Sequence, residues 1–448
     1  METDNPGTAQ EPGKNARNAL RGAALGYFVD MFDIYLPVIV IAPALIYFVR
    51  AGTDLSTTSL VGGSIFAAAL LGRPVGAAIF GHFADTLGRR RATFVAVAGF
   101  GVCTLLLGLL PGYQSWGSMA IITFIGLRFV GGIFLGGEYT AANPLAMESA
   151  PPGRRGLYSA IINCGFGLAY AACSLITLAL LHWLPSATVD SAYVQWGWRI
   201  PFFIGAALSF ALLGYYRFAV GESELWRGAE HTRSPIRQLF SSGGARRFGQ
   251  IFVLMTGIWL ASETATAILP IVLRVDTGLT STTTTAVLTV SFLFLLPVNL
   301  TTGVLGQRYG RRRALIVLAV LALTVAMLTY FLLASGHPGN LFVVCLLSAV
   351  TVAIIVVPFG ILPAYINERF TLGVRSSGYG LAYSLPVILP SFYSFYQLWL
   401  GHIMPAKYTA LVLLGVGALC ALAGAVWGPE TKDAQLGSTR LEEELVAG

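Results

Sequence analysis

Six ionisable side chains stand inside long apolar segments, where a charge is hard to accommodate. They are Asp30, Asp33, Arg73, Arg128, Glu138 and Glu263. A carboxyl group in such surroundings can hold a proton in one state of a protein and lose it in another. A buried arginine needs a carboxylate partner or an anionic ligand. These residue types therefore favour proton movement, anion binding, or both.

The composition shows what surrounds these charges. Charged residues make up 11% of the 448 residues, hydrophobic residues make up 55%, and the mean hydropathy is +0.71. A soluble domain carries about 25% charged residues. The chain is therefore predicted to be a membrane protein rather than several soluble domains.

Twelve apolar segments are long enough to cross a bilayer, which takes about 20 residues. We expect an all-α membrane protein with a disordered polar N-terminal tail (1–20) and six helices (21–218). A polar central loop (219–247), six further helices (248–428) and a polar C-terminal tail (429–448) follow.

The basic residues predict the orientation. Of the 28 lysines and arginines, 22 fall in the tails and in loops after even-numbered spans, four in the other loops, and two within spans. Because Lys and Arg accumulate on the cytoplasmic side, both termini are predicted to be cytoplasmic, in a cell membrane. The isoelectric point of about 9.2 therefore does not indicate nucleic-acid binding.

The two halves of the chain repeat each other. The segment GHFADTLGRRRA (81–92) aligns with GVLGQRYGRRRA (303–314), 222 residues later. A glutamate followed seven residues later by an arginine also recurs with an offset of 220, as Glu148–Arg155 and Glu368–Arg375. Repeated six-helix halves are typical of alternating-access transporters, which bind substrate between the halves near the membrane midplane.

The repeated loop, with its pattern G-x-x-x-D-x-x-G-R-R-R, resembles the signature of the major facilitator superfamily. The resemblance extends from about Ala19 to Asp433. The segments Gly72–Arg91 and Arg128–Gly156 resemble the metabolite:proton symporters, which carry organic acids or zwitterions such as proline and betaine. This implies two pseudo-symmetric six-helix bundles and proton-coupled symport.

The resemblance also implies a cytoplasmic gate. In the family, the loop aspartate lies against the N-terminus of a neighbouring helix and holds that face closed in one state. By position the gate would contain Asp85, Arg89, Glu148, Arg155, Glu368 and Arg375. Gln307 replaces the aspartate in the second half, so a weaker latch is expected there. The alternative is that these charges only anchor the topology.

Depth along the helices places Asp33 beside Arg128. At about 1.5 Å per residue, Asp33 lies about 18 Å inside span 1 and Arg128 about 15 Å inside span 4 from the opposite surface. Both are then near the middle of a core about 30 Å thick. Sugar porters and their relatives carry an acid and an arginine at matching positions. We predict that Asp33 carries the coupled proton, and that an anionic substrate binds near Arg128. A static structural pair is the alternative.

The other buried charges have several possible roles. Asp30 lies one helical turn from Asp33 and could share its proton or contact substrate. Glu138 stands in a GGEY motif that relatives also carry, which implies coupling or gating. Arg73 either extends toward the surface or pairs with Glu138. Glu263 is alone in span 7 and is expected to contact substrate or to titrate.

Polar and aromatic residues of the central spans are expected to line a cavity, although helix packing explains each one equally well. The predicted substrate-site residues are Arg128, Glu263, Tyr27, Asn143, Asn163, Tyr383, Tyr393 and Gln397. Pro386 and Pro390 are expected to interrupt span 11 and free its backbone toward the cavity.

Together these features predict a secondary active transporter that carries a small organic acid with protons by alternating access. Alternatives are a zwitterion or sugar symporter, or a drug or metabolite exporter of the same fold. A sensor is disfavoured by the short tails, and an enzyme by the lack of a catalytic cluster. The five cysteines lie in apolar runs and the histidines are scattered, so no metal or cofactor is expected. We expect a monomer that interacts with its substrate, protons and lipid.

Overall fold

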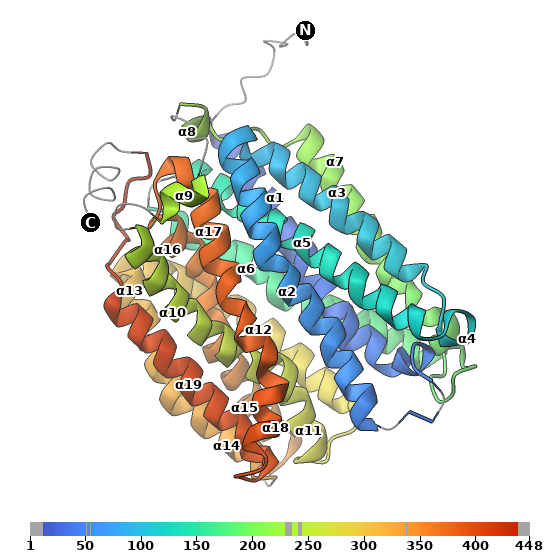
Figure 1. Cartoon of the computed structure of the whole chain (residues 1–448). Coiled ribbons are helices and arrows are strands. Elements are labelled where there is room, and N and C mark those ends of the chain that lie inside the picture. Colours follow the sequence, from blue (N-terminus) through green and yellow to red (C-terminus); the bar gives the residue numbers. More distant parts are fainter. Residues whose placement is uncertain are drawn as a thin grey trace.

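The protein is a bundle of long helices (Figure 1). The computed structural model describes residues 12–50, 52–53, 55–151, 153–228, 235–240, 244–336 and 339–437, and these form helices and no strands. Within them, 11 helices are long and apolar enough to cross a membrane. A further crossing, span 11, is interrupted. The prediction of an all-helical membrane protein is confirmed.

The first half contains six spans. Span 1 is α1 (Pro12–Tyr35), continued by a π-helical turn and a 3-10 turn to Tyr47. The others are α2 (Leu55–Leu87), α3 (Arg89–Gly108), α5 (Ser118–Ser149), α6 (Arg155–Trp183) and α7 (Arg199–Phe218). Three short helices, α4 (Tyr113–Trp116), α8 (Glu224–Arg227) and α9 (Pro235–Leu239), lie in connections.

The second half repeats this order. Three of its spans are built from two consecutive helices: α10 (Gly244–Glu263) with α11 (Leu269–Val275), α13 (Arg311–Leu321) with α14 (Met327–Ala334), and α15 (Leu341–Val356) with α16 (Leu362–Asn367). The continuous spans are α12 (Ser281–Tyr309) and α19 (Ala406–Trp427).

Span 11 is broken next to its prolines, as the sequence predicts. Helix α17 (Arg375–Ser384) gives way to two short 3-10 turns, and α18 (Tyr393–Leu400) follows. The turns contain Pro386 and Pro390, which lack the N–H that a continuous α-helix requires. Every residue of α17 is buried.

Small residues allow α2 and α5 to pack closely. Gly72 and Gly76 of α2 lie directly against the backbone of α5, and Gly132 and Gly136 of α5 lie against the backbone of α2. Any Cβ at these four positions would overlap backbone atoms of the other helix. Glycines four residues apart are a common device for close helix contact in membranes. Here the contact fixes Arg73, which lies between the two glycines of α2.

The two halves meet through symmetry-related pairs of helices. Helix α2 packs against α17, and α6 packs against α12. Since spans 2 and 5 of the first half correspond to spans 8 and 11 of the second, these contacts are equivalent under the repeat. Helix α5 also contacts α17. Helix α17 is therefore placed against the helices that carry Arg73 and Glu138.

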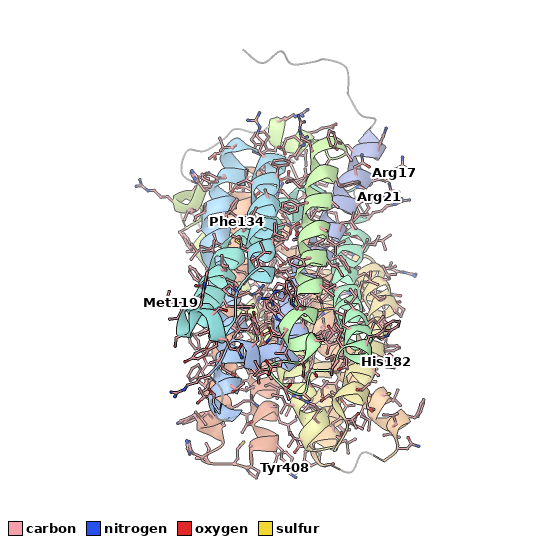
Figure 2. All side chains as sticks on the ribbon, turned by 90° about the vertical axis from the view of Figure 1, so that its right-hand side faces the viewer. Arg17, Arg21, Met119, Phe134, His182 and Tyr408 are labelled. Carbon is pink, nitrogen blue, oxygen red and sulfur yellow. The ribbon has the colours of Figure 1, made fainter. Side chains whose placement is uncertain are left out.

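Both ends of the described chain lie at one end of the bundle. Figure 1 places α8 and α9 at this end and α11 and α18 at the other, and Figure 2 labels Arg17 and Arg21 at the first end and Tyr408 at the opposite one. We call the first end the basic end, because it carries Arg89, Arg155, Arg311 and Arg375; the other is the far end.

Part of the N-terminal tail that was expected to be disordered is helical, and part of the polar C-terminal tail packs against the bundle. Helix α1 begins at Pro12, inside the segment expected to be a disordered tail, because Asn15 and Asn18 bond to the chain after span 6. Residues 429–437 also pack on the body, and Leu436 is buried. Residues 1–11 and 438–448 lie outside the described residues.

Candidate functional site

The structure joins Asp33 and Arg128, as their depths predict. Arg128 Nη1 lies 2.5 Å from Asp33 Oδ2, and Thr104 donates a hydrogen bond to Asp33 Oδ1 at 2.6 Å. All three side chains are buried. The aspartate is therefore satisfied on both oxygens by helices of its own half. Arg128 is not among the residues that line the cavity described below.

Arg73 makes a second buried ion pair, with Asp30. Its Nη2 donates to Asp30 Oδ1 at 2.6 Å, and neither residue is more than 1% exposed. The sequence left two alternatives for Arg73: it extends toward the membrane surface, or it pairs with Glu138. The rotation of α1 about its axis, which the sequence does not fix, instead turns Asp30 toward α2. Arg73 also lies over the ring of Tyr139, 5.5 Å from its centre.

Glu138 is buried without a partner. It is 1% exposed, and neither Oε1 nor Oε2 accepts a hydrogen bond from any described residue. Its carboxyl group fills the space above Gly26 of α1, where any Cβ would overlap it. A bare carboxylate in such a place is costly, so this geometry suits a neutral carboxyl group.

A small cavity of about 30 Å³ lies between the halves, on the far-end side of Arg73. Helices α1, α2, α6 and α10 contribute to it. Its wall includes Tyr35, Phe66, Phe166, Trp259, Glu263 and Thr266. Glu263 is 2% exposed and its Oε2 has no hydrogen-bond partner among the described residues. Glu263 is thus the acidic group of a wall whose other residues are aromatic, aliphatic or hydroxyl-bearing.

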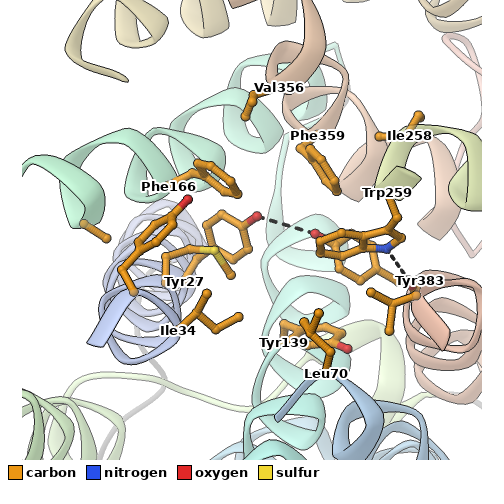
Figure 3. Close-up of a cluster of buried hydrophobic side chains, with 14 of the residues drawn as sticks. Tyr27, Ile34, Leu70, Tyr139, Phe166, Ile258, Trp259, Val356, Phe359 and Tyr383 are labelled. Atoms are coloured by element: carbon orange, nitrogen blue, oxygen red, sulfur yellow. Dashed lines mark hydrogen bonds between the residues drawn. The ribbon is translucent and has the colours of Figure 1, made fainter. Parts of the chain in front are cut away.

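Tyrosines close the interface between the cavity and the basic end (Figure 3). The hydroxyl groups of Tyr27 and Tyr383, from opposite halves, are 3.4 Å apart. Trp259 Nε1 donates to the backbone oxygen of Tyr383 at 2.9 Å. Tyr139 of α5 forms a second hydrogen bond across the interface, with Ser384.

The remaining predicted substrate residues are Asn143, Asn163, Tyr393 and Gln397. Asn163 donates to Asn299 across the interface at 3.0 Å, so it ties α6 to α12. Asn143 bonds to its own helix, and Gln397 bonds to Thr409 of α19. Tyr393 is half-buried on α18. None of these four lines the cavity. The sequence analysis missed Phe66, Phe166 and Thr266, which are brought together only by the packing of several helices.

At the basic end, Asp85 reaches across to the second half. Its two carboxylate oxygens accept the backbone N–H groups of Ser376 at 3.0 Å and Ser377 at 2.8 Å. These are N–H groups of the first turn of α17, where a helix offers unpaired donors and a partial positive charge. Arg89 lies 3.4 Å from the same carboxylate.

Glu148 bridges arginines from both halves. Its Oε1 is 3.1 Å from Arg89 Nη2 and 3.1 Å from Arg375 Nη1, and Ser223 donates to its Oε2 at 2.5 Å. Arg89 also donates to the backbone oxygen of Leu372 in the second half. The cluster therefore links four segments that are distant in sequence.

The second half contains a related but weaker arrangement. Glu368 lies 2.9 Å from Arg311 and 3.8 Å from Arg155. Burial raises the pKa of Glu368 to about 7, against the lowering effect of Arg311. Gln307, at the place of Asp85, accepts the N–H of Gly156 at 3.0 Å. One neutral hydrogen bond thus replaces the two charged ones of Asp85.

Sequence reasoning missed two glutamates at the basic end. Glu222 accepts the N–H groups of Arg89 and Arg90, both at 3.1 Å, and so caps α3. Glu430 caps α13 in the same way, accepting from Arg311 at 2.8 Å. Each follows the sixth span of its half and precedes a hydroxyl residue, Ser223 or Thr431. That repeated Glu–Ser/Thr pair was the available signal.

The match to known proteins agrees with this geometry. The family model for the Major Facilitator Superfamily matches residues 23–385. The chain belongs to the major facilitator superfamily. It is a transporter and an integral membrane protein, not an enzyme.

This major facilitator protein is similar to several curated transport proteins and to solved structures of the same fold. It is 30% identical over 396 residues to the inner membrane metabolite transport protein YhjE of Escherichia coli, covering 84% of this chain and 86% of the relative. It is 28% identical to a citrate-proton symporter of Klebsiella pneumoniae, with 80% of each chain covered. It is 27% identical to the ectoine/proline transporter ProP of Corynebacterium glutamicum, covering 84% and 77%. The proton:xylose symporter XylE, 18% identical, has the same fold, with a TM-score of 0.74 over 97% of this chain and all of that one.

Proposed function

We propose that this major facilitator transporter couples protons to the uptake of a small organic solute that bears a carboxylate. The observation that carries the proposal is the set of buried acids around the interface. Asp30, Asp33 and Glu138 lie in the first half and Glu263 lies on the cavity wall. Burying several ionisable groups near the midplane is costly unless they move protons or bind solute.

Proton binding at Asp33 depends on its ion pair. Arg128 donates to one oxygen of Asp33 and Thr104 donates to the other, so both oxygens are occupied in the structure. Protonation requires that pair to loosen. Both members belong to the same half, so rocking of the two halves does not by itself separate them. Entry of water from one side, or a change in the packing of α3 and α5, is the step that would let Asp33 take up a proton.

A carboxylate on the solute is supported by two observations. Citrate, ectoine and proline, which the names of two relatives mention, all carry one. Arg73 retains two N–H donors, on Nε and Nη1, that no described residue accepts. It lies one helical turn from Leu70 of the cavity wall. These donors are suited to a carboxylate even though Asp30 already neutralises the charge.

Within this class the cavity favours a solute that also carries a positively charged nitrogen. Glu263 supplies a carboxyl group, and Trp259 and Phe166 supply ring faces, which attract organic cations. No Lys or Arg among the described residues lines the cavity. This differs from the sequence-based expectation of an anion at Arg128, which is not among the residues that line the cavity. A dicarboxylate would meet Glu263 with like charge.

Uptake into proteoliposomes under an imposed pH gradient tests the proposal. The labelled solutes are a betaine, an amino acid such as proline, a monocarboxylate, a dicarboxylate and a sugar. Uptake of a carboxylate-bearing solute should require the gradient and stop when a protonophore is added. Zwitterions should compete better than dicarboxylates. Uptake restricted to sugars, or insensitive to the protonophore, would contradict the proposal.

A further inference from the structure

A buried cluster separate from the Asp33–Arg128 pair lies where the first half meets α17. It consists of Asp30 on α1, Arg73 on α2 and Glu138 on α5. We infer that this cluster takes up and releases a second proton, at Glu138, for each solute carried. The inference rests on the proposed symport and adds a second titrating site to it.

The charges within the cluster do not balance when both of its acids are ionised. The cluster contains two carboxyl groups and one guanidinium group, and the guanidinium donates to Asp30 rather than to Glu138. With both acids ionised the cluster would carry an uncompensated negative charge at 1% exposure or less. One proton removes that charge. Glu138, which has no partner, is the group on which it resides.

Glu138 also interacts electrostatically with titratable groups other than Asp30 and Arg73. They are the hydroxyl groups of Tyr139, Tyr216 on α7 and Tyr379 on α17. A tyrosine is neutral at physiological pH and supplies no charge. Arg73 is thus the cation available to Glu138 among the described residues, and Asp30 holds it.

Access of water to the cluster from the basic end depends on helix α17. Helix α17 covers the cluster: Tyr383 bonds to Tyr27, Ser384 bonds to Tyr139, and Gly380 lies directly against Thr140 beside them. All three contacts join opposite halves. If the halves separate at the basic end, α17 withdraws from α1 and α5 and water can enter. The O–H bond of Glu138 then breaks, its proton passes to water on that side, and Arg73 can turn toward the new carboxylate.

Reloading would come from the other side. The cavity begins next to the cluster, since its wall contains Met31, which follows Asp30, and Leu70, one turn from Arg73. When the basic end is closed, as here, the cluster is sealed toward the basic end and adjoins the cavity. Glu138 regains a proton from water of the cavity before it is buried in the state that the structure describes.

Counting protons per solute tests this. Solute is accumulated to equilibrium in proteoliposomes across a pH gradient with the membrane potential clamped to zero. Each coupled proton raises the accumulation ratio about tenfold per pH unit. The wild type should reach about 100-fold per pH unit, and Glu138→Gln about tenfold, with solute exchange retained. Asp190→Asn, at an exposed loop acid, is the matched control and should equal the wild type.

Three outcomes separate the possibilities. A wild-type slope of one proton, or a Glu138→Gln slope equal to the wild type, overturns the second site but leaves proton symport standing. Failure of the wild type to accumulate any solute overturns the proposed symport itself. If Glu138→Gln does not fold, the number of protons coupled per solute is compared between the wild type and Asp33→Asn. Two protons in the wild type and one in Asp33→Asn support a second site. No coupled proton in Asp33→Asn contradicts it.

Discussion

Replacing Asp85 with asparagine tests how the two halves are held together at the basic end. In the structure each carboxylate oxygen accepts one backbone N–H of α17, from Ser376 and Ser377. Asparagine offers one acceptor, and its NH₂ group would face the second N–H donor. The variant therefore loses one charge-assisted hydrogen bond, reduces the other to a neutral one, and gives up the attraction to the helix N-terminus.

The size of the effect follows from these losses. A hydrogen bond to a charged group contributes about 1.5–3 kcal/mol and a neutral one about 0.5–1.5 kcal/mol. Removing a buried charge also removes part of its desolvation cost, which favours the low end of the sum. A net loss of about 2 kcal/mol would shift the ratio of closed to open molecules at the basic end about 30-fold.

Distances between spin labels on the two halves measure this shift. Arg91 on α3 and Arg313 on α13 are exposed, one in each half, and suit labelling after the five native cysteines are replaced. Asp85→Asn should populate a longer distance that the wild type scarcely shows, and it should slow uptake while leaving solute binding intact.

The repeat provides a matched control. Gln307 occupies the equivalent place and makes one neutral hydrogen bond across the interface, to Gly156. Gln307→Ala should therefore cost about 1 kcal/mol, or about fivefold. The reasoning is refuted if Asp85→Asn keeps both the wild-type distances and the wild-type uptake. A larger shift in Gln307→Ala than in Asp85→Asn would contradict the role given to the charge.

Three further predictions concern single acids. Asp33→Asn should still exchange solute but accumulate it about tenfold less per pH unit, measured as above; an unchanged ratio would exclude Asp33 from coupling. Glu263→Gln should weaken binding of zwitterions at least about tenfold and leave dicarboxylates unaffected or improved, in a competition assay; equal losses for both would argue against a contact with the positive charge. The pKa of Glu368 is about 7 when the basic end is closed, and it should fall to about 4.3 when opening exposes the carboxyl group. Closing is therefore favoured below the ordinary pKa and loses this contribution as pH rises through 7, so the labelled halves should separate more at about pH 8 than at about pH 5. Glu368→Gln should reduce that pH dependence, and a wild type with the opposite slope would contradict the sign.

The fold was largely predictable because the bilayer imposes strong constraints on a chain. Apolar runs of the required length could be counted, and the prolines of span 11 located the break. The start of α1 was not predictable in the same way. Residues 12–20 are largely polar, and they are tied to the chain after span 6 as a helix: Asn18 donates to the backbone oxygen of Ala219, and Asn15 accepts the N–H of Gly221. No local pattern in the sequence records those contacts.

Contacts within the site were predictable where the depth of a residue along its helix was enough to place it. The rise of a helix fixes the depth of a residue, so Asp33 and Arg128 could be placed at the same level, and the structure joins them. Which way a residue faces depends on helix rotation, which tertiary packing decides. The pairing of Arg73 with Asp30 rather than Glu138 was for that reason beyond the sequence. The functional roles of these residues stay predictions.

The six ionisable side chains within the apolar segments are divided unequally between the halves, and this has a consequence for coupling. Five belong to the first half, and Glu263 alone belongs to the second. If protons bind in one half and the solute lies against the other, the two events must communicate through contacts that cross the interface. Tyr383 occupies that position: its hydroxyl group bonds to Tyr27, one turn from Asp30, and its backbone oxygen accepts from Trp259 of the cavity wall. A solute that moves Trp259 thereby acts on the same residue that seals the proton cluster. The chemical asymmetry of the repeat thus allows occupancy of the cavity and release of the proton to be linked through one tyrosine.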